Sequence, residues 1–169
     1  MNRALRPEIE IRKGEELKMK QRFDLTTLAA AGYKAMLGVH GYVQKSGLDL
    51  GLLEVVKMRV SQMNGCAFCL AMHAPLARQH GVSEDQLTLL AAWREAPVFS
   101  AKEKAALAWA EGMTVLKDGD VPDAVYEQVC AQFTPREIAD LSFAVAEINA
   151  WNRLMVCSRT PPAVAAAAE

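Results

Sequence analysis

Residues 46–73 read SGLDLGLLEVVKMRVSQMNGCAFCLAMH, and they carry two consecutive helix signals. Asp49 suits an N-cap position because its carboxylate can accept the free N–H groups of a first helical turn. Beyond it, apolar residues recur at helical spacing, as Leu53, Val56, Val60 and Met63. Gly65 favours a stop, since glycine adopts a left-handed backbone without strain. We therefore expect one helix over about 49–64 and a second over about 66–80.

Helix signals continue on both sides of this segment, whereas strand signals are nearly absent. Pro75 lacks an N–H and clashes one turn back, so we expect a kink or a short break after His73. Capping boxes mark three later helix starts, at Ser83, Ser100 and Thr134. The remaining expected helices cover about 25–38, 83–93, 100–117, 122–130 and 135–157. The predicted fold is a single all-α domain with about six to eight helices.

Composition and charge narrow the class of function. The chain has 169 residues, of which 51% are hydrophobic and 23% charged, as expected of one globular domain. Nineteen Lys and Arg stand against twenty Asp and Glu, and this balance argues against a nucleic-acid partner. No apolar run approaches the roughly 20 residues that cross a bilayer, so no membrane partner is expected. The first twenty residues contain no signal-peptide core, which predicts a cytoplasmic location.

The two ends of the chain differ in composition from its middle. Residues 1–20 are rich in both charge signs and predict a polar N-terminal arm. Residues 161–169 predict an Ala- and Pro-rich C-terminal tail, which leaves 21–160 for the helical domain. Within that domain, 138–157 is apolar around much of its circumference. Such a helix is typical of a core or a subunit interface, so we expect a homo-oligomer.

Three potentially reactive residues, Cys66, Cys69 and His73, share one face of a predicted helix, because their offsets are 0, 3 and 7. Only a thiolate is a good nucleophile. Cys66 follows the break at Gly65, where the helix dipole stabilises an anion, whereas Cys69 lies one turn before an imidazole that can take its proton. We rank Cys69 first as the attacking sulfur, because that imidazole can also supply a proton to a leaving oxygen. The pair can then store two electrons as a disulfide.

Glu54, on the preceding helix, is the candidate that would orient His73 and raise its basicity. The alternative for Glu54 is an exposed position or an ion pair with Lys57, three residues later. A zinc site would need four convergent ligands, and His80 lies about 10 Å beyond His73 along a straight helix. We therefore expect no metal and no other cofactor.

The other His, Cys and aromatic residues are expected to serve packing or the surface. His40 has no partner in its sequence neighbourhood, so we expect a surface or capping role, as for His80. Cys130 and Cys157 lie in apolar helical contexts, which predicts burial in the core. Trp151 is expected in the core or at a subunit interface, with a lining role at the site as the alternative.

The acid, the two cysteines and the histidine are spaced as Glu54, eleven residues, Cys66-x-x-Cys69, three residues and His73. This pattern resembles that of the AhpD-like alkylhydroperoxidases of the carboxymuconolactone decarboxylase family. AAWREAP at 91–97 and INAWNRL at 148–154 extend the resemblance to about 22–161. It implies an AhpD-like all-helical fold that assembles as trimers or hexamers.

The resemblance also implies a role for each residue of the pattern. Cys69 would be the peroxidatic cysteine and Cys66 the resolving one, while Glu54 and His73 would form a proton relay. Phe68 departs from AhpD, which has a second histidine just before its second cysteine. The expected function is that of a thiol peroxidase, an antioxidant oxidoreductase that reduces a hydroperoxide through a redox-active disulfide and is reset by an external dithiol.

Two other functions are alternatives. A lactone or β-keto acid decarboxylase or isomerase would use Glu54 and His73 as acid and base, and it would tolerate serine at both cysteine positions. A non-enzymatic, redox-sensing oligomer would instead use a Cys66–Cys69 disulfide to change how a partner docks. Three observations distinguish these functions: turnover of peroxide, dependence of activity on the cysteines, and a change of assembly on oxidation.

Overall fold

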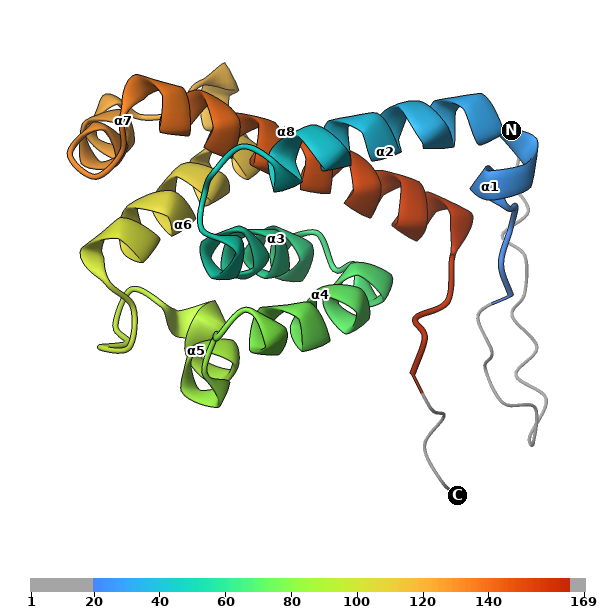
Figure 1. Ribbon diagram of the computed structural model, residues 1–169, viewed down its shortest axis with the longest axis horizontal. Coiled ribbons are helices and arrows are strands. Elements are labelled where there is room, and N and C mark those ends of the chain that lie inside the picture. The colour runs from blue at the N-terminus through green and yellow to red at the C-terminus, as the bar shows by residue number, and fades with distance from the viewer. Residues whose placement is uncertain (1–19, 165–169) are drawn as a thin grey trace, which may run out of the picture.

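The computed structural model describes residues 20–164, and within them it has eight α-helices, two short 3₁₀ helices and no strand (Figure 1). The helices are α1 (Leu25–Leu28), α2 (Ala30–Gln44), α3 (Leu50–Met63), α4 (Ala67–Gln79), α5 (Glu84–Leu89), α6 (Ala101–Val115), α7 (Asp123–Cys130) and α8 (Pro135–Ser158), with η1 (Leu90–Ala92) and η2 (Lys117–Gly119) between them. The predicted all-α fold is confirmed. The predicted arm lies outside the described residues except for Lys20, and the tail is described only as far as Val164. None of the helices within 20–164 has the length and apolar character needed to cross a bilayer.

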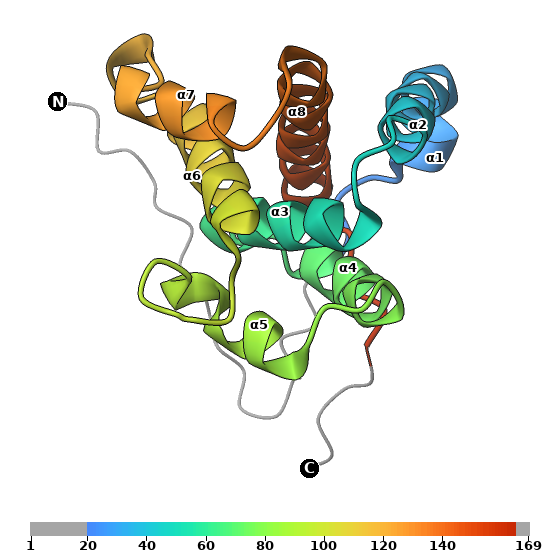
Figure 2. The same ribbon diagram turned by 60° about the vertical axis from the view of Figure 1, so that its left-hand side comes forward.

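Helix α3 lies at the centre and packs against α4, α6 and α8 (Figures 1 and 2). Leu53 and Val60 pack into a hydrophobic cluster that includes residues of α6 and α8. Val55 and Met58 pack into a second cluster, formed with α6 and the α5–η1 segment. Because α3 is covered on both sides, any polar side chain on it must find its partner inside the protein.

The connection from α3 to α4 sets the position of Cys66. Gly65 has a φ of +66°, which a residue with a Cβ adopts only with strain. The N–H of Gly65 donates to the carbonyl of Gln62, and the N–H of Cys66 donates to the carbonyl of Ser61 at 2.9 Å. These two bonds make up a Schellman motif, so the stop predicted at Gly65 is confirmed. They also turn the chain so that Cys66 becomes the N-cap residue of α4.

Two helix predictions are wrong in detail. The helix expected over 25–38 is interrupted at Ala29, whose φ and ψ of −135° and 42° are not helical, and α2 then continues to Gln44. The break expected after His73 is absent, because α4 runs unbroken through Pro75. Proline removes only one backbone donor, and packing of α4 against α3 and α8 holds the turns on either side of it.

The burial predicted for Cys130 and Cys157 is also wrong, since both side chains are exposed. Each has a buried neighbour in sequence, Val129 in α7 and Ser158 in α8, and each faces away from the side that packs. An apolar sequence context therefore predicted the helix correctly but not the face on which the cysteine lies.

Gly51 allows the start of α3 to approach the end of α4 closely. A Cβ on Gly51 would lie 2.9 Å from the backbone carbonyl oxygen of His80, which cannot move as a side chain does. We therefore expect Gly51→Ala to lower the free energy of unfolding by about 1–3 kcal/mol in urea denaturation. Gly38→Ala, in the interior of α2 with no atom within 4 Å of the new Cβ, is the control and should raise it by about 0.5–1 kcal/mol. Equal shifts for both variants would rule out the steric explanation.

Candidate active site

Cys66 and Cys69 form a buried pair of free thiols where α4 begins. Each is 1% exposed, and their Sγ atoms lie 2.8 Å apart. The backbone N–H of Cys69 also donates to Sγ of Cys66, at 3.4 Å. A sulfur in this N-cap position receives both a hydrogen bond and the positive end of the helix dipole. The two sulfurs are thus within reach of a disulfide, at a helix terminus that stabilises an anion.

The hydrogen bond within the pair determines which sulfur carries a charge. The Cys69 thiol donates to Sγ of Cys66, and this bond outweighs burial and lowers the pKa of Cys66 to about 7. Donating that bond, together with burial, raises the pKa of Cys69. The resting thiolate therefore lies on Cys66, as the helix-start argument favoured. The imidazole argument for Cys69 required a hydrogen bond between His73 and that thiol, and His73 instead bonds to Glu54.

We expect the thiolate absorbance of the reduced protein to include one component that titrates near pH 7. Cys69→Ala removes the Sγ–H donor, so the pKa of Cys66 should rise towards that of an ordinary thiol, about 8.5. Cys130→Ala, a change of an exposed cysteine outside the site, should leave the neutral component in place. A midpoint that stays near neutrality in Cys69→Ala would mean that another group stabilises the thiolate.

Ser61 and Asn152 add a buried polar layer behind the cysteines. The Asn152 side-chain amide donates to Oγ of Ser61 at 3.0 Å, and Asn64 donates to Oδ1 of Asn152 at 2.9 Å. Hydrogen bonding by Asn152 also favours the thiolate form of both cysteines. This layer therefore orients donors towards the sulfurs from α3 and α8.

Glu54 and His73, which the sequence placed on adjacent helices, meet in the core. Nδ1 of His73 lies 2.7 Å from Oε2 of Glu54, and both side chains are buried. Glu54 thus occupies neither the exposed position nor the pair with Lys57 considered as alternatives. Among the described residues, however, no hydrogen bond joins the His73 imidazole to Cys66 or Cys69. The sequence spacing therefore predicted correctly that His73 lies on the same side of the site as Cys69, but the imidazole makes no hydrogen bond to a thiol.

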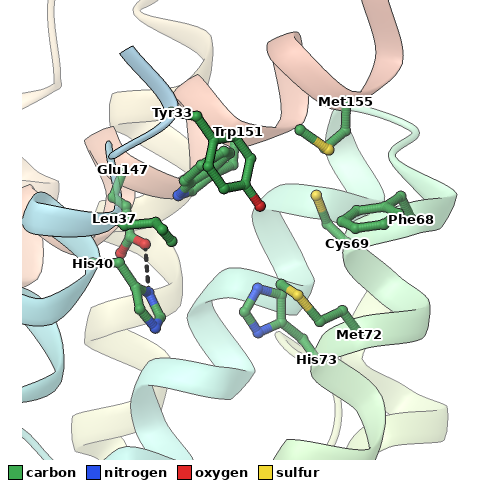
Figure 3. A pocket seen from close by; sticks show the side chains of 10 residues that line it. All are labelled: Tyr33, Leu37, His40, Phe68, Cys69, Met72, His73, Glu147, Trp151 and Met155. Carbon is green, nitrogen blue, oxygen red and sulfur yellow. Dashed lines mark hydrogen bonds and ion pairs between the residues drawn. The ribbon is translucent and has the colours of Figure 1, made fainter. Parts of the chain in front are cut away.

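A cavity of about 120 Å³ lies between α2, α4 and α8 (Figure 3). Its lining residues are Tyr33, Leu37, His40, Phe68, Cys69, Met72, His73, Glu147, Trp151 and Met155. Most of this wall is apolar, and Tyr33 packs edge-to-face on Trp151 with ring centroids 5.1 Å apart. Trp151 therefore lines the site, which sequence reasoning held only as the alternative. The cavity has the size and character to hold a small apolar molecule beside Cys69 and His73.

The second sulfur opens onto a different cavity. Cys66 lines a pocket of about 290 Å³ on the other side of Phe68, together with apolar residues near the end of α8. Arg22 and Arg159 also line this second cavity and give it a basic character. The two cysteines are therefore approached from separate pockets, although their sulfurs are in contact.

Sequence reasoning missed a second histidine–carboxylate pair, in which the carboxylate is buried and the histidine is partly exposed. Nδ1 of His40 lies 2.7 Å from Oε1 of Glu147, and Oε2 of Glu147 lies 3.4 Å from Nζ of the fully buried Lys57. The position expected for His40 holds in part, since its side chain is 39% exposed, but its partner on α8 was not expected. One signal was present in the sequence. Glu54, Lys57 and Ser61 stand at offsets 0, 3 and 7 on the otherwise apolar α3, and each meets a partner on another helix.

The described part of the chain does not gather three or more His, Cys, Asp or Glu side chains in a metal-binding arrangement. At the cysteine pair, His73 is engaged with Glu54. Its ring therefore does not converge with the two sulfurs as a tetrahedral site requires.

Comparisons with known proteins show the family and the fold of this chain. The family model of the carboxymuconolactone decarboxylase family matches residues 29–112. The uncharacterized protein YdfG of Bacillus subtilis is 38% identical over 138 residues, which cover 82% of this chain and 94% of YdfG. The crystal structure of ATU0492 from Agrobacterium tumefaciens, a protein of unknown function whose name links it to the antioxidant defence protein AhpD, superposes with a TM-score of 0.83 at 36% identity, over 86% of this chain and all of the other. An alkylhydroperoxidase AhpD core protein from Ralstonia eutropha shares the fold, with a TM-score of 0.70 at 20% identity, over 79% of this chain and 71% of that one.

Proposed function

Because the chain belongs to the carboxymuconolactone decarboxylase family, we propose that it is a thiol-dependent peroxidase that reduces organic hydroperoxides. The observation that carries the proposal is a pair of free thiols 2.8 Å apart, one of which lines an apolar cavity together with a buried Glu–His pair. A nucleophilic sulfur, a second sulfur in bonding reach and a proton relay are the groups that such a reaction needs.

In the proposed reaction, the proton of Cys69 first moves to the Cys66 thiolate along their hydrogen bond. Sγ of Cys69 then attacks the terminal oxygen of the hydroperoxide, so an S–O bond forms, the O–O bond breaks and an alkoxide leaves. His73, oriented by Glu54, is the proton relay on the Cys69 side of the cavity and supplies the proton with which the sulfenic hydroxyl later leaves as water. Cys66 next attacks the sulfenic acid, which releases water and forms the disulfide. An external dithiol reduces this disulfide and is itself oxidised.

The two cavities support the assignment of different roles to Cys69 and Cys66. Cys69 shares its cavity with His73, which suits the sulfur that meets the hydroperoxide. Cys66 lines the second cavity, where the guanidinium groups of Arg22 and Arg159 would stabilise an attacking thiolate of the dithiol. Hydroperoxide and reductant would then approach opposite ends of one disulfide.

The test is stopped-flow consumption of cumene hydroperoxide by the reduced protein. We expect one equivalent of hydroperoxide to disappear as a Cys66–Cys69 disulfide forms, and continuous turnover when dithiothreitol is added. Hydrogen peroxide should react at least about tenfold more slowly, because it gains nothing from the apolar wall. If the parent reacts no faster than a variant with serine at both positions, the proposal is refuted. Oxidation without turnover would instead favour the redox-sensing alternative.

Assembly as a homo-oligomer stays a prediction. Tyr42 on α2 and Phe143 on α8 support it, because both large aromatic side chains are exposed. They pack edge-to-face at 5.4 Å and together form an apolar patch on the outer face of the two helices. A patch of this kind is typical of a surface that another subunit covers.

A further inference from the structure

The His40–Glu147 pair lies on the wall of the cavity opposite Cys69. His40 comes from α2, whereas Cys69 and His73 come from α4, and Figure 3 shows the two groups facing each other across the space. Nδ1 of His40 is held by Glu147 at 2.7 Å. Its other ring nitrogen, Nε2, has no hydrogen-bond partner among residues 20–164. His40 therefore keeps one ring nitrogen without a partner, on a partly exposed side chain that lines the cavity across from Cys69 and His73.

Glu147 holds the imidazole ring of His40 in one orientation. Its side chain is 2% exposed, with one oxygen on His40 and the other 3.4 Å from Nζ of Lys57. Burial opposes ionisation, but the hydrogen bond from His40 and the charge of Lys57 outweigh it and lower the pKa of Glu147. An ionised carboxylate at Nδ1 keeps a proton on that nitrogen, so protonation of the imidazole places the additional proton on Nε2.

A proton donor on this wall suits the cleavage of an O–O bond by Cys69. In a displacement at oxygen, the attacking sulfur and the leaving oxygen lie on opposite sides of the oxygen under attack. A leaving alkoxide therefore moves away from α4 and towards α2. An alkoxide is a strong base, and a positioned acid that protonates it in the transition state accelerates the step by about 10²–10⁴-fold.

We propose, on the basis of the peroxidase function above, that His40 is a second catalytic acid, which donates its Nε2 proton to the alkoxide oxygen of an organic hydroperoxide. Glu147 is its positioning residue, and Lys57 keeps Glu147 ionised. As Cys69 Sγ bonds to the terminal oxygen and is oxidised by two electrons, the O–O pair leaves on the alkoxide oxygen. That oxygen takes the proton from His40 and departs as the alcohol, and the neutral imidazole regains its proton from solvent.

The experiment compares two oxidants that differ in the need for an acid. tert-Butyl hydroperoxide must expel a strongly basic alkoxide, whereas peracetic acid expels acetate, which leaves without protonation. Single-turnover oxidation of the reduced protein is followed by tryptophan fluorescence. Trp151 serves as the reporter because it lines the cavity in which the reaction is proposed to occur. His40→Gln should slow the alkyl hydroperoxide by about 100-fold and leave the peracid rate within about twofold of the parent. His80→Gln, outside the cavity, is the matched control and should change neither rate.

The pattern across the two oxidants separates catalysis from structure. Glu147→Gln keeps the shape of the side chain but removes its charge, so it should also slow the alkyl hydroperoxide selectively. Equal slowing of both oxidants by His40→Gln, or slowing of neither, would overturn the role of His40 while leaving the peroxidase intact. A parent protein that reacts with neither oxidant would instead refute the proposed function itself.

Discussion

Cys69→Ser is expected to lower the rate of hydroperoxide reduction by about 10³-fold or more, to that of the protein-free reaction. A serine hydroxyl stays protonated at neutral pH and is a poor nucleophile towards oxygen, so no sulfenic acid can form at position 69. The neighbouring Cys66 carries the resting thiolate, but it lines the other cavity, away from His73. The measurement is the second-order rate constant for cumene hydroperoxide with the fully reduced variant.

Cys66→Ser is the matched control, because it removes the other sulfur of the same pair. The variant should consume one equivalent of hydroperoxide and stop, with a sulfenic acid on Cys69 that a dimedone probe traps. The opposite pattern, with the trapped acid on Cys66 in Cys69→Ser, would reverse the two assigned roles. Decarboxylation of a β-keto acid or lactone that survives in both variants would favour the acid–base alternative.

Local chemistry allowed the helices to be predicted. Asp49, Ser100 and Thr134 cap helix starts through contacts with residues only three positions away, and the structure has all three bonds. The stop at Gly65 depends likewise on one residue's freedom to adopt a positive φ. Such signals are visible in sequence because both partners lie within one helical turn.

Side-chain pairs that join two helices could not be predicted from such local signals. His40 and Glu147 are 107 positions apart, and nothing near either residue indicates the other. Lys57 could be matched only with Glu54, its neighbour at i−3, yet tertiary packing directs these two side chains towards α8 and α4 respectively. The pairing of Glu54 with His73 was expected mainly because the spacing resembled that of a known family. Spacing along a chain sets which residues share a helix face, but packing decides what each face meets.

Lys57→Met is expected to lower the free energy of unfolding by about 3–5 kcal/mol near neutral pH. Lys57 is fully buried, and its Nζ lies 3.4 Å from Oε2 of Glu147. Methionine fills nearly the same volume but leaves the Glu147 carboxylate buried with only His40 as a partner. Because the native pKa of Glu147 is lowered, its ionised form stabilises the fold above the ordinary carboxyl range, and that contribution fades on acidification. The loss in Lys57→Met should therefore be largest near neutrality and shrink in acidic buffer.

Adding Glu147→Gln to Lys57→Met separates the charge from the packing of the lysine stem. If the loss comes from an uncompensated carboxylate, the double variant should be more stable than Lys57→Met alone, because replacing both charges removes the desolvated anion. If it comes from the packed methylene groups of Lys57, the second change would restore nothing, and the loss would not vary with pH. The same double variant also bears on His40. Glutamine keeps an acceptor for Nδ1 of His40 but removes the anion that stabilises the protonated ring. A recovered fold with an impaired alkyl hydroperoxide reaction would therefore show that the charge of Glu147 serves catalysis at a cost in stability.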